Sequence, residues 1–261
     1  MSFRILQATP SMGASTIRLF CLPYAGGGAA VYRNWGQLAP DWLQICPIEF
    51  PGRGWRKAEP LATSLVSLAE AIAAALHPYA WAPYAIFGHS MGALLAYEVA
   101  TRMDNSAKRQ LCKLFVSGSR PPFVPPKRPP VSHLPNPEFI ERLREMQGTP
   151  EEVLSHPELM ELMLPVLRSD FAMCEQYCLQ QPYRLHIPIT VLAGEQDEDA
   201  TETDMLPWSL LTRETFRSLR FAGTHFFVRE QEAAIVQAIS TELEDFRTSI
   251  ETATVPPTMA G

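Results

Sequence analysis

Residues 84–103 read YAIFGHSMGALLAYEVATRM, and the rest of the chain can be interpreted from this stretch outward. An apolar run at 84–88 leads into Gly88-His89-Ser90-Met91-Gly92, and apolar residues at helical spacing follow from Met91 to Met103. A strand, a G-x-S-x-G turn and a helix in this order are typical of a nucleophile elbow. Glycines at 88 and 92 let backbone pass close by, while Ser90 projects from the top of the sheet.

Strand-like and helix-like segments alternate on both sides of this elbow. Apolar runs rich in β-forming residues occur at 17–23, 44–50, 84–88, 111–118, 189–194 and 216–221. Helical spacing is found at 64–76, at 91–103 and in a closing segment at about 229–246. With the elbow, this alternation predicts an α/β chain of the α/β-hydrolase fold, with a mostly parallel sheet flanked by helices.

The alternation stops between about residues 120 and 182. Eight prolines between 121 and 137 predict an extended connector, and Asn136 is expected to cap a helix that follows it. A second helix, from about 158 to 179, has too many large apolar side chains for one amphipathic stripe. It is either a helix buried in the core or a lid over a binding pocket. We assign 1–119 and 183–250 to the hydrolase core, 120–182 to a helical lid insertion and 251–261 to a disordered tail.

Composition excludes several classes of partner. The chain has 28 acidic residues and 22 Lys and Arg, so its net charge is -6. Neither nucleic acid nor an anionic membrane is therefore expected to bind. The five cysteines cannot all pair and show no zinc-ligand spacing, which predicts reduced, mostly buried thiols; Cys174 and Cys178 could share a helix face. No apolar run has the length of a signal peptide or a membrane span. We expect a cytoplasmic monomer without metal or cofactor.

A serine hydroxyl needs a base within hydrogen-bond reach, and that base needs an orienting carboxylate. In the α/β-hydrolase fold the chain order is Ser, acid, His, and His225 alone among six histidines follows Gly194-Glu195-Gln196-Asp197. His225 is therefore the candidate base. Asp197 is the favoured acid because it lies three residues past the strand at 189–194, but Glu195, Glu198 and Asp199 are near it. Asp170 lies outside the expected order and is interpreted as a local helix or lid contact.

The tetrahedral intermediate of such a reaction also needs two hydrogen-bond donors. One is expected from the backbone N–H of Met91, at the start of the helix after Ser90. For the second we choose the N–H of Ala25, within Leu22-Pro23-Tyr24-Ala25-Gly26-Gly27-Gly28, because glycines let backbone amides face a cavity. A phosphate-binding loop is the competing interpretation, but the segment lacks the Lys-Ser/Thr of a P-loop and the G-x-G-x-x-G of a dinucleotide site.

Seven motifs spread over about residues 17–246 resemble those of a known family, the type II (editing) thioesterases that accompany nonribosomal peptide and polyketide synthetases. The motifs are Leu22-Pro23-Tyr24-Ala25-Gly26-Gly27, Pro51-Gly52-Arg53-Gly54, Gly88-His89-Ser90-Met91-Gly92-Ala93, Leu134-Pro135, Gly148-Thr149-Pro150, Leu164-Pro165-Val166-Leu167-Arg168-Ser169-Asp170-Phe171 and His225-Phe226-Phe227. The resemblance implies Ser90, Asp197 and His225 as the triad, the amides of Ala25 and Met91 as the oxyanion hole, and a helical lid.

Two positions depart from the pattern of this family. Thr224 stands before the histidine, where the family commonly has Gly. A negative φ at Thr224 would accommodate the replacement. The run Glu195-Gln196-Asp197-Glu198 replaces a more usual Asp-Asp or Asp-Pro, and this leaves the choice of acid open.

The resemblance implies hydrolysis of aberrant or stalled acyl or aminoacyl groups from the phosphopantetheine arms of carrier-protein domains, in a siderophore pathway of the yersiniabactin kind. A general carboxylesterase or an acyltransferase with the same triad is one alternative, and a non-catalytic partner that stabilises a synthetase is another. Carrier domains are often acidic, as this chain is, so docking needs a local basic patch. Lys127 with Arg128, or Lys108, Arg109 and Lys113, are the candidates for it.

Overall fold

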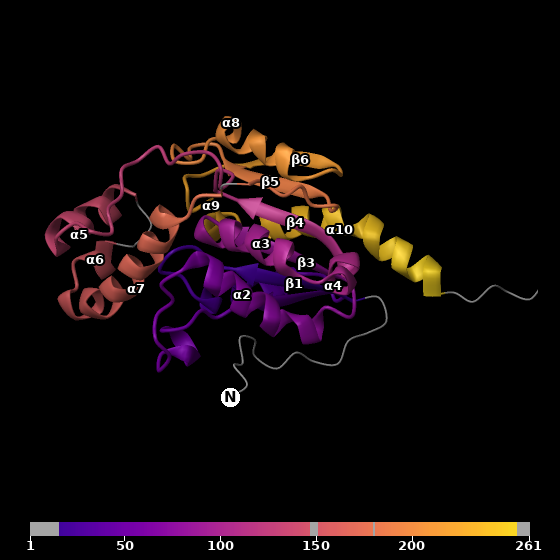
Figure 1. Cartoon of the computed structure of the whole chain (residues 1–261), viewed down its shortest axis with the longest axis horizontal. Coiled ribbons are helices and arrows are strands. Elements are labelled where there is room, and N and C mark those ends of the chain that lie inside the picture. The colour runs from indigo at the N-terminus through magenta and orange to yellow at the C-terminus, as the bar shows by residue number, and fades with distance from the viewer. Residues whose placement is uncertain (1–15, 147–150, 180, 255–261) are drawn as a thin grey trace, which may run out of the picture.

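A computed structural model describes residues 16–146, 151–179 and 181–254 of the chain. Its described part contains a six-stranded, entirely parallel sheet with the order β2-β1-β3-β4-β5-β6 (Figure 1). The strands are β1 (Ile17–Leu22), β2 (Leu43–Pro47), β3 (Tyr84–His89), β4 (Leu111–Ser117), β5 (Ile189–Gly194) and β6 (Phe216–Phe221). The prediction of an α/β-hydrolase fold is confirmed, and each strand lies where an apolar run was found.

Both faces of the sheet are covered by helices, so its central strands β1, β3 and β5 are buried on both sides. Phe20 and Leu22 of β1 pack toward α2 (Leu65–Leu76) and α3 (Met91–Arg102). Leu19 and Cys21 point the other way, toward α1 (Trp35–Leu38) and α10 (Glu232–Thr254). Figure 1 shows α2 and α3 in front of the sheet and α10 behind it. Because side chains alternate along a strand, the continuous apolar runs reflect burial on both faces.

The strand order reverses direction next to the elbow. From β1 the chain crosses outward to β2, and from there it returns to β3 on the other side of β1. In open α/β sheets such a switch point leaves a crevice at the carboxyl ends of the two strands. Leu22 and Gly88, near these ends, are paired in register, so the loops after β1 and β3 begin side by side.

The described residues between β4 and β5 include three helices, which form a lobe beyond the carboxyl end of β4 (Figure 1). They are α5 (Asn136–Glu145), α6 (Glu151–Leu154) and α7 (Pro157–Gln176), which we call the helical lobe. The lobe has its own apolar cluster of Val131, Phe139, Leu143, Leu154, Met160, Leu164 and Leu167. Leu162 of α7 is 74% exposed, so α7 is not a helix enclosed by the main core.

Several local details differ from the sequence predictions. Asn136 does not cap α5: it is the first helical residue, Pro135 precedes it, and its Oδ1 accepts a hydrogen bond from Arg168. α7 ends at Gln176, so Cys178 lies outside the helix and is exposed. α10 continues to Thr254, into the segment expected to be a tail. Residues 255–261, the rest of that segment, lie outside the described residues. The same holds for residues 1–15 and for the motif Gly148-Thr149-Pro150.

Short helices complete the chain: the α-helices α4 (Asn105–Gln110), α8 (Glu202–Met205) and α9 (Phe227–Glu230), and the 3-10 helices η1 (Ala29–Tyr32), η2 (Gly54–Arg56), η3 (His77–Tyr79) and η4 (Leu206–Leu211). None of the helices in the described ranges combines the length and apolar character that crossing a membrane requires.

A buried ion pair joins β4 to α10. Lys113 is 6% exposed, and its Nζ lies 2.5 Å from Oε2 of Glu242, which is 8% exposed. Burial opposes ionisation of Glu242, but Lys113, Arg217 and Thr190 together hold the pKa of its carboxyl below the usual value. The prediction that Lys113 contributes to an exposed docking patch is therefore wrong.

Glu242→Gln is expected to lower the free energy of unfolding by about 3 kcal/mol, because it leaves the Lys113 ammonium buried without a carboxylate. Urea unfolding measures the change. The matched control is Glu244→Gln on the same helix, where the carboxylate is half exposed and paired with Arg247, so a loss below about 0.5 kcal/mol is expected. Equal losses in the two variants would contradict the role given to the buried pair.

Candidate active site

Ser90 occupies a strained turn between β3 and α3. Its φ of 56° and ψ of -117° make it the only non-glycine with positive φ in the described ranges. Such a conformation costs about 1–3 kcal/mol and persists only where neighbours enforce it. Here the N–H of Ser90 donates to the carbonyl of Ser117 at the end of β4, over 2.8 Å. The elbow predicted from Gly88-His89-Ser90-Met91-Gly92 thus lies between a buried strand and a helix.

The two glycines of the elbow lie against backbone. A Cβ on Gly88 would lie 2.0 Å from the carbonyl oxygen of Gly92, and one on Gly92 would lie 2.1 Å from that of Leu22. Neither backbone can move without disturbing the contact between α3 and β1. Close approach, which only glycine permits, is therefore the reason for both residues.

Gly92→Ala is expected to lower the free energy of unfolding by more than about 3 kcal/mol, because its methyl group would overlap main-chain atoms rather than a flexible side chain. Gly36→Ala is the matched control: in α1, a Cβ there meets nothing within 4 Å, and the change is expected to be neutral or slightly stabilising. Urea unfolding of both variants tests this, and coincident curves would refute the steric explanation.

His225 and Asp197 are brought together by the last two strands of the sheet. Asp197 follows β5 and His225 follows β6, and these strands are paired as far as Gly194 and Phe221. Nδ1 of His225 lies 2.8 Å from Oδ2 of Asp197. The other carboxylate oxygen, Oδ1, accepts from the N–H groups of Asp199 at 2.9 Å and Ala200 at 3.0 Å.

Burial and hydrogen bonding distinguish Asp197 from the other acidic residues of its loop. Asp197 is 3% exposed, whereas Glu195 and Glu198 are exposed and Asp199 forms an ion pair with Arg128. Burial works against the charged form of Asp197. The hydrogen bonds from His225 and the two backbone amides outweigh it, so the pKa of this carboxyl lies below its usual value. Of the four acidic candidates, Asp197 is the one hydrogen-bonded to His225, and it stays ionised there.

Thr224 has the backbone conformation that the sequence required. Gly223, the residue before it, has a φ of 121°, whereas the φ of Thr224 is not among the positive values. The replacement of glycine by threonine before His225 is therefore accommodated without left-handed backbone strain.

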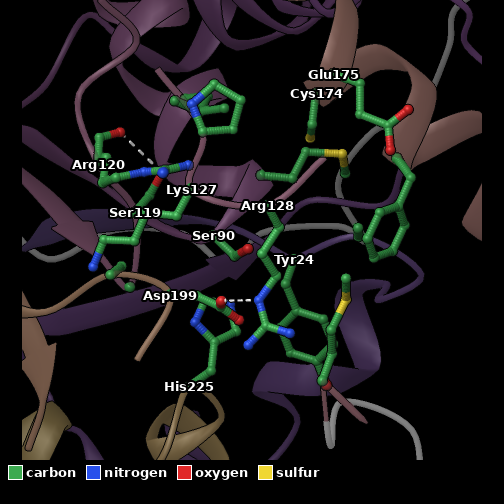
Figure 2. Close-up of a pocket in the computed structure, with 18 of the residues that line it drawn as sticks. Tyr24, Ser90, Ser119, Arg120, Lys127, Arg128, Cys174, Glu175, Asp199 and His225 are labelled. Atoms are coloured by element: carbon green, nitrogen blue, oxygen red, sulfur yellow. Dashed lines mark hydrogen bonds and ion pairs between the residues drawn. The ribbon is translucent and has the colours of Figure 1, made fainter. Parts of the chain in front are cut away.

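Ser90 and His225 face one cavity of about 270 Å³, together with Ala25 and Met91. Figure 2 shows the Ser90 hydroxyl and the His225 ring opening into the same space, with Tyr24 beside them. In the described part of the chain no hydrogen bond joins Ser90 to His225. Catalytic hydrogen bonds often reach 2.6–3.2 Å only when substrate binds, so a small movement of either side chain is expected on binding.

The helical lobe supplies an apolar wall to this cavity. Leu143 comes from α5, and Leu167, Phe171 and Cys174 come from α7. Burial raises the pKa of the Cys174 thiol, so it remains a neutral, apolar group. The cavity is suited to an apolar chain ending near Ser90.

The cysteines are less uniformly buried than predicted, since Cys112 and Cys174 are only half-buried and Cys178 is exposed.

His89 is a site residue that the sequence reasoning did not single out. It is fully buried, its ring centroid lies 5.1 Å from that of His225, and its Nδ1 lies 2.9 Å from Oγ of Ser117. Burial, and then the neighbouring His225, lower the pKa of His89 well below the usual value. It therefore stays neutral and adds no second positive charge beside His225. His89 occupies a variable position of the G-x-S-x-G pattern, so the pattern does not indicate this role.

The candidate docking cations do not form one free basic patch. Lys127 and Arg128 lie on the cavity wall, but they are paired with Asp204 and Asp199. Lys108 and Arg109 belong to α4, which precedes β4 and so lies at the amino end of that strand, away from the cavity. Only Lys127 and Arg128 remain near the site, with their charges balanced.

Comparison with known proteins agrees with the geometry. A family model described as a thioesterase domain matches residues 17–243. The gramicidin S biosynthesis protein GrsT of Aneurinibacillus migulanus is 36% identical over 230 residues, which cover 88% of this chain and 90% of GrsT. The type II thioesterase BorB from the borrelidin biosynthetic cluster superimposes with a TM-score of 0.81 at 32% identity, covering 93% of this chain and 99% of BorB.

A third similar protein is YbtT, a type II thioesterase from the yersiniabactin NRPS/PKS biosynthetic pathway. Its structure, solved as a serine-to-alanine mutant, has a TM-score of 0.78 at 28% identity and covers 88% of this chain and 94% of YbtT. The resemblance to type II thioesterases found in the motifs is thus confirmed over most of the sequence. The chain belongs to the thioesterase family.

Proposed function

We propose that this protein is a serine thioesterase that hydrolyses aberrant or stalled acyl or aminoacyl groups from the phosphopantetheine arms of carrier-protein domains in nonribosomal peptide or polyketide synthesis. One observation carries the proposal: His225, hydrogen-bonded to the buried Asp197, and the strained Ser90 open into a single cavity with an apolar wall. Membership of the thioesterase family supports a thioester as the substrate, and the serine-to-alanine mutant of YbtT supports a serine nucleophile.

The reaction follows from the order of the contacts. Asp197 accepts a hydrogen bond from the Nδ1–H of His225, so the lone pair on Nε2 is available to take the proton of the Ser90 hydroxyl. Ser90 Oγ attacks the thioester carbonyl carbon, and the resulting oxyanion is stabilised by the N–H groups of Ala25 and Met91. Collapse of this intermediate breaks the carbon–sulfur bond and releases the pantetheine thiolate, which leaves Ser90 acylated.

Water completes the cycle. His225 gives its proton to the released thiolate and, neutral again, removes one from a water molecule, which attacks the acyl-enzyme carbonyl. The second tetrahedral intermediate expels Ser90, whose Oγ takes the proton back from His225, and the carboxylic acid leaves. Because a thiolate departs without prior protonation, catalysis depends mainly on activating Ser90 and on the oxyanion hole. The helical lobe acts as a lid that holds the acyl chain against Leu167 and Phe171.

The expected partner is a carrier domain, which must bring its arm to the cavity. A carrier domain would deliver its arm past Lys127 and Arg128, which lie on the cavity wall. Their ion pairs with Asp204 and Asp199 leave little net charge for attraction, so contacts other than charge must contribute to docking. The yersiniabactin-type pathway stays a prediction, since relatives of higher identity belong to gramicidin S and borrelidin biosynthesis.

Three substrates with the same acyl group distinguish this function from its alternatives: an acylated carrier protein, an acyl-pantetheine analogue and a simple oxygen ester. Hydrolysis of both thioesters in preference to the oxygen ester is expected, with the higher kcat/KM on the carrier. Preference for the oxygen ester would identify a general carboxylesterase, and transfer of the acyl group to an added alcohol or amine would identify an acyltransferase. If Ser90→Ala restored product yield in cells lacking the protein, a non-catalytic role would replace the proposal.

A further inference from the structure

Asp170 on α7 connects the helical lobe to the loop after β1. Its side chain is fully buried, and Oδ2 accepts from the backbone N–H of Gly26 at 2.7 Å. The same carboxylate forms a bidentate pair with Arg53, at 2.6 Å and 2.8 Å. The NH1 group of Arg53 also donates to the carbonyl of Gly27 over 3.0 Å. We call these two side chains and their bonds to Gly26 and Gly27 the Arg53–Asp170 clamp.

The clamp holds the turn of residues 24–27, which contains the expected oxyanion donor. Within this turn the N–H of Gly27 donates to the carbonyl of Tyr24 over 2.9 Å. Since the C=O and N–H of a trans peptide point in opposite directions, this bond also fixes the direction of the Ala25 N–H. The clamp bonds the N–H of Gly26 and the C=O of Gly27, which lie on either side of the peptide that donates to Tyr24, so it restrains the turn that orients the Ala25 N–H.

α7 packs directly onto the turn as well. Gly26 has a φ of 78°, and a Cβ there would lie 2.4 Å from Cδ2 of Leu167. Leu167 and Asp170, one helical turn apart on α7, therefore contact the same residue of the turn. The conformation of the turn depends on α7 being seated against it.

The charges of the clamp suit a neighbouring oxyanion. A lone carboxylate next to the turn would repel negative charge that develops on the substrate oxygen. The Arg53 guanidinium neutralises Asp170 at 2.6 Å, so the carboxylate can order Gly26 without that electrostatic cost. A buried ion pair is by itself a weak source of stability, and an apolar pair of similar volume often does as well. Because the Arg53–Asp170 pair also bonds to Gly26 and Gly27, a role in positioning the turn explains it better than a role in stability does.

We propose that Arg53 and Asp170 are positioning residues that hold the Ala25 N–H in place for the oxyanion, and that they couple completion of the oxyanion hole to seating of the helical lobe. Withdrawal of α7 removes the partner of the Gly26 N–H and the Leu167 contact together. The inference rests on the proposed function, because it requires Ser90 to form an oxyanion.

Arg53→Lys, Arg53→Gln and Asp170→Asn are expected to lower kcat about 10- to 100-fold, with little change in KM, because the loss falls on the transition state. A trifluoromethyl ketone analogue of the acyl-pantetheine, which Ser90 attacks to form an oxyanion, is expected to lose affinity in parallel. The corresponding thioether, which forms no oxyanion, is expected to bind as it does to the wild type.

Two further variants keep the test decisive. Arg53→Gln with Asp170→Asn avoids a lone buried charge in case the single variants do not fold, and its kcat loss is expected to resemble that of a single variant. The matched control is Arg168→Ala, two residues before Asp170 on α7. Arg168 bonds to the carbonyl of Ser132 and to Asn136 and does not contact the turn. This variant is expected to lower stability with no selective loss of ketone binding.

The inference is overturned if the clamp variants raise KM at unchanged kcat, if ketone and thioether affinities change together, or if Arg168→Ala reproduces the whole effect at equal folded fraction. Rates are compared at equal folded fraction, measured by circular dichroism. Ser90→Ala separates this failure from that of the proposed function. If Ser90→Ala retains activity, the serine mechanism itself is wrong; if Ser90 is essential and the clamp variants behave like Arg168→Ala, only the positioning role is lost.

Discussion

Replacing Ser90 with alanine is expected to lower kcat for acyl-thioester hydrolysis by on the order of 10⁶-fold, because the variant can form no acyl-enzyme. The fold should survive, since the strained turn is held by the bond of the Ser90 N–H to Ser117 and by the glycines at 88 and 92, none of which needs the hydroxyl. Steady-state hydrolysis of an acyl-pantetheine substrate, with circular dichroism of the same sample, measures both effects.

Ser119→Ala provides the control for Ser90→Ala. Ser119 lies on the wall of the same cavity, and its hydroxyl bonds only to the carbonyl of Arg120 among the described residues. Activity close to the wild type is expected for this variant. A Ser119→Ala loss as large as that of Ser90→Ala, or a Ser90→Ala protein that hydrolyses at the wild-type rate, would remove Ser90 from the mechanism.

Asp197→Asn is the second change with a large expected effect, a fall in kcat on the order of 10⁴-fold. The amide has the shape of the carboxylate, but it can donate a proton toward Nδ1 of His225 and stabilise the tautomer whose Nε2 already carries a proton. That tautomer cannot accept the proton of Ser90. A neutral side chain would also fail to stabilise the imidazolium that forms during attack.

Asp199→Asn is the matched control for the acid. It lies two residues further along the same loop, but its carboxylate pairs with Arg128 rather than with His225. Its kcat is expected to change little. Equal losses in the two variants would leave the acid unassigned, and a larger loss in Asp199→Asn would transfer the role to that residue.

Asp197 should also affect the acid stability of the protein. Its pKa is lowered on folding, so its contribution to stability is present above the usual carboxyl value of about 3.9 and is lost as pH falls through the lowered folded value. Asp197→Asn lacks this contribution. Its free energy of unfolding should therefore fall less steeply than that of the wild type as pH falls below about 4.

The fold could be predicted because its signals are local. The central strands β1, β3 and β5 are buried on both faces and therefore appear as nearly continuous apolar runs, and the elbow concentrates strand, turn and helix within twenty residues. The exceptions are also local. Asn136 was expected to cap α5, but Pro135 takes the preceding position and the Asn136 side chain bonds to Arg168 on another helix, which the α5 segment alone does not reveal.

Parts of the site depend on distant partners and could not be predicted in this way. Choosing Asp197 among four acidic residues rests on its burial and on the bond to His225, 28 positions away. Asp170 was interpreted as a local lid contact, yet its partners Arg53 and Gly26 lie 117 and 144 positions away. Charged pairs with such separations leave no periodic pattern in a single sequence.

Mapping of a fluorophosphonate label by peptide mass spectrometry shows whether Ser90 is the activated nucleophile. The reagent reacts with a serine only where a base and an oxyanion hole activate it, as His225 and the amides of Ala25 and Met91 are proposed to activate Ser90. One labelled site is expected, at Ser90, with complete loss of thioesterase activity on full labelling and no label in Ser90→Ala. A label on a different residue, or full hydrolytic activity after Ser90 is completely modified, would contradict it.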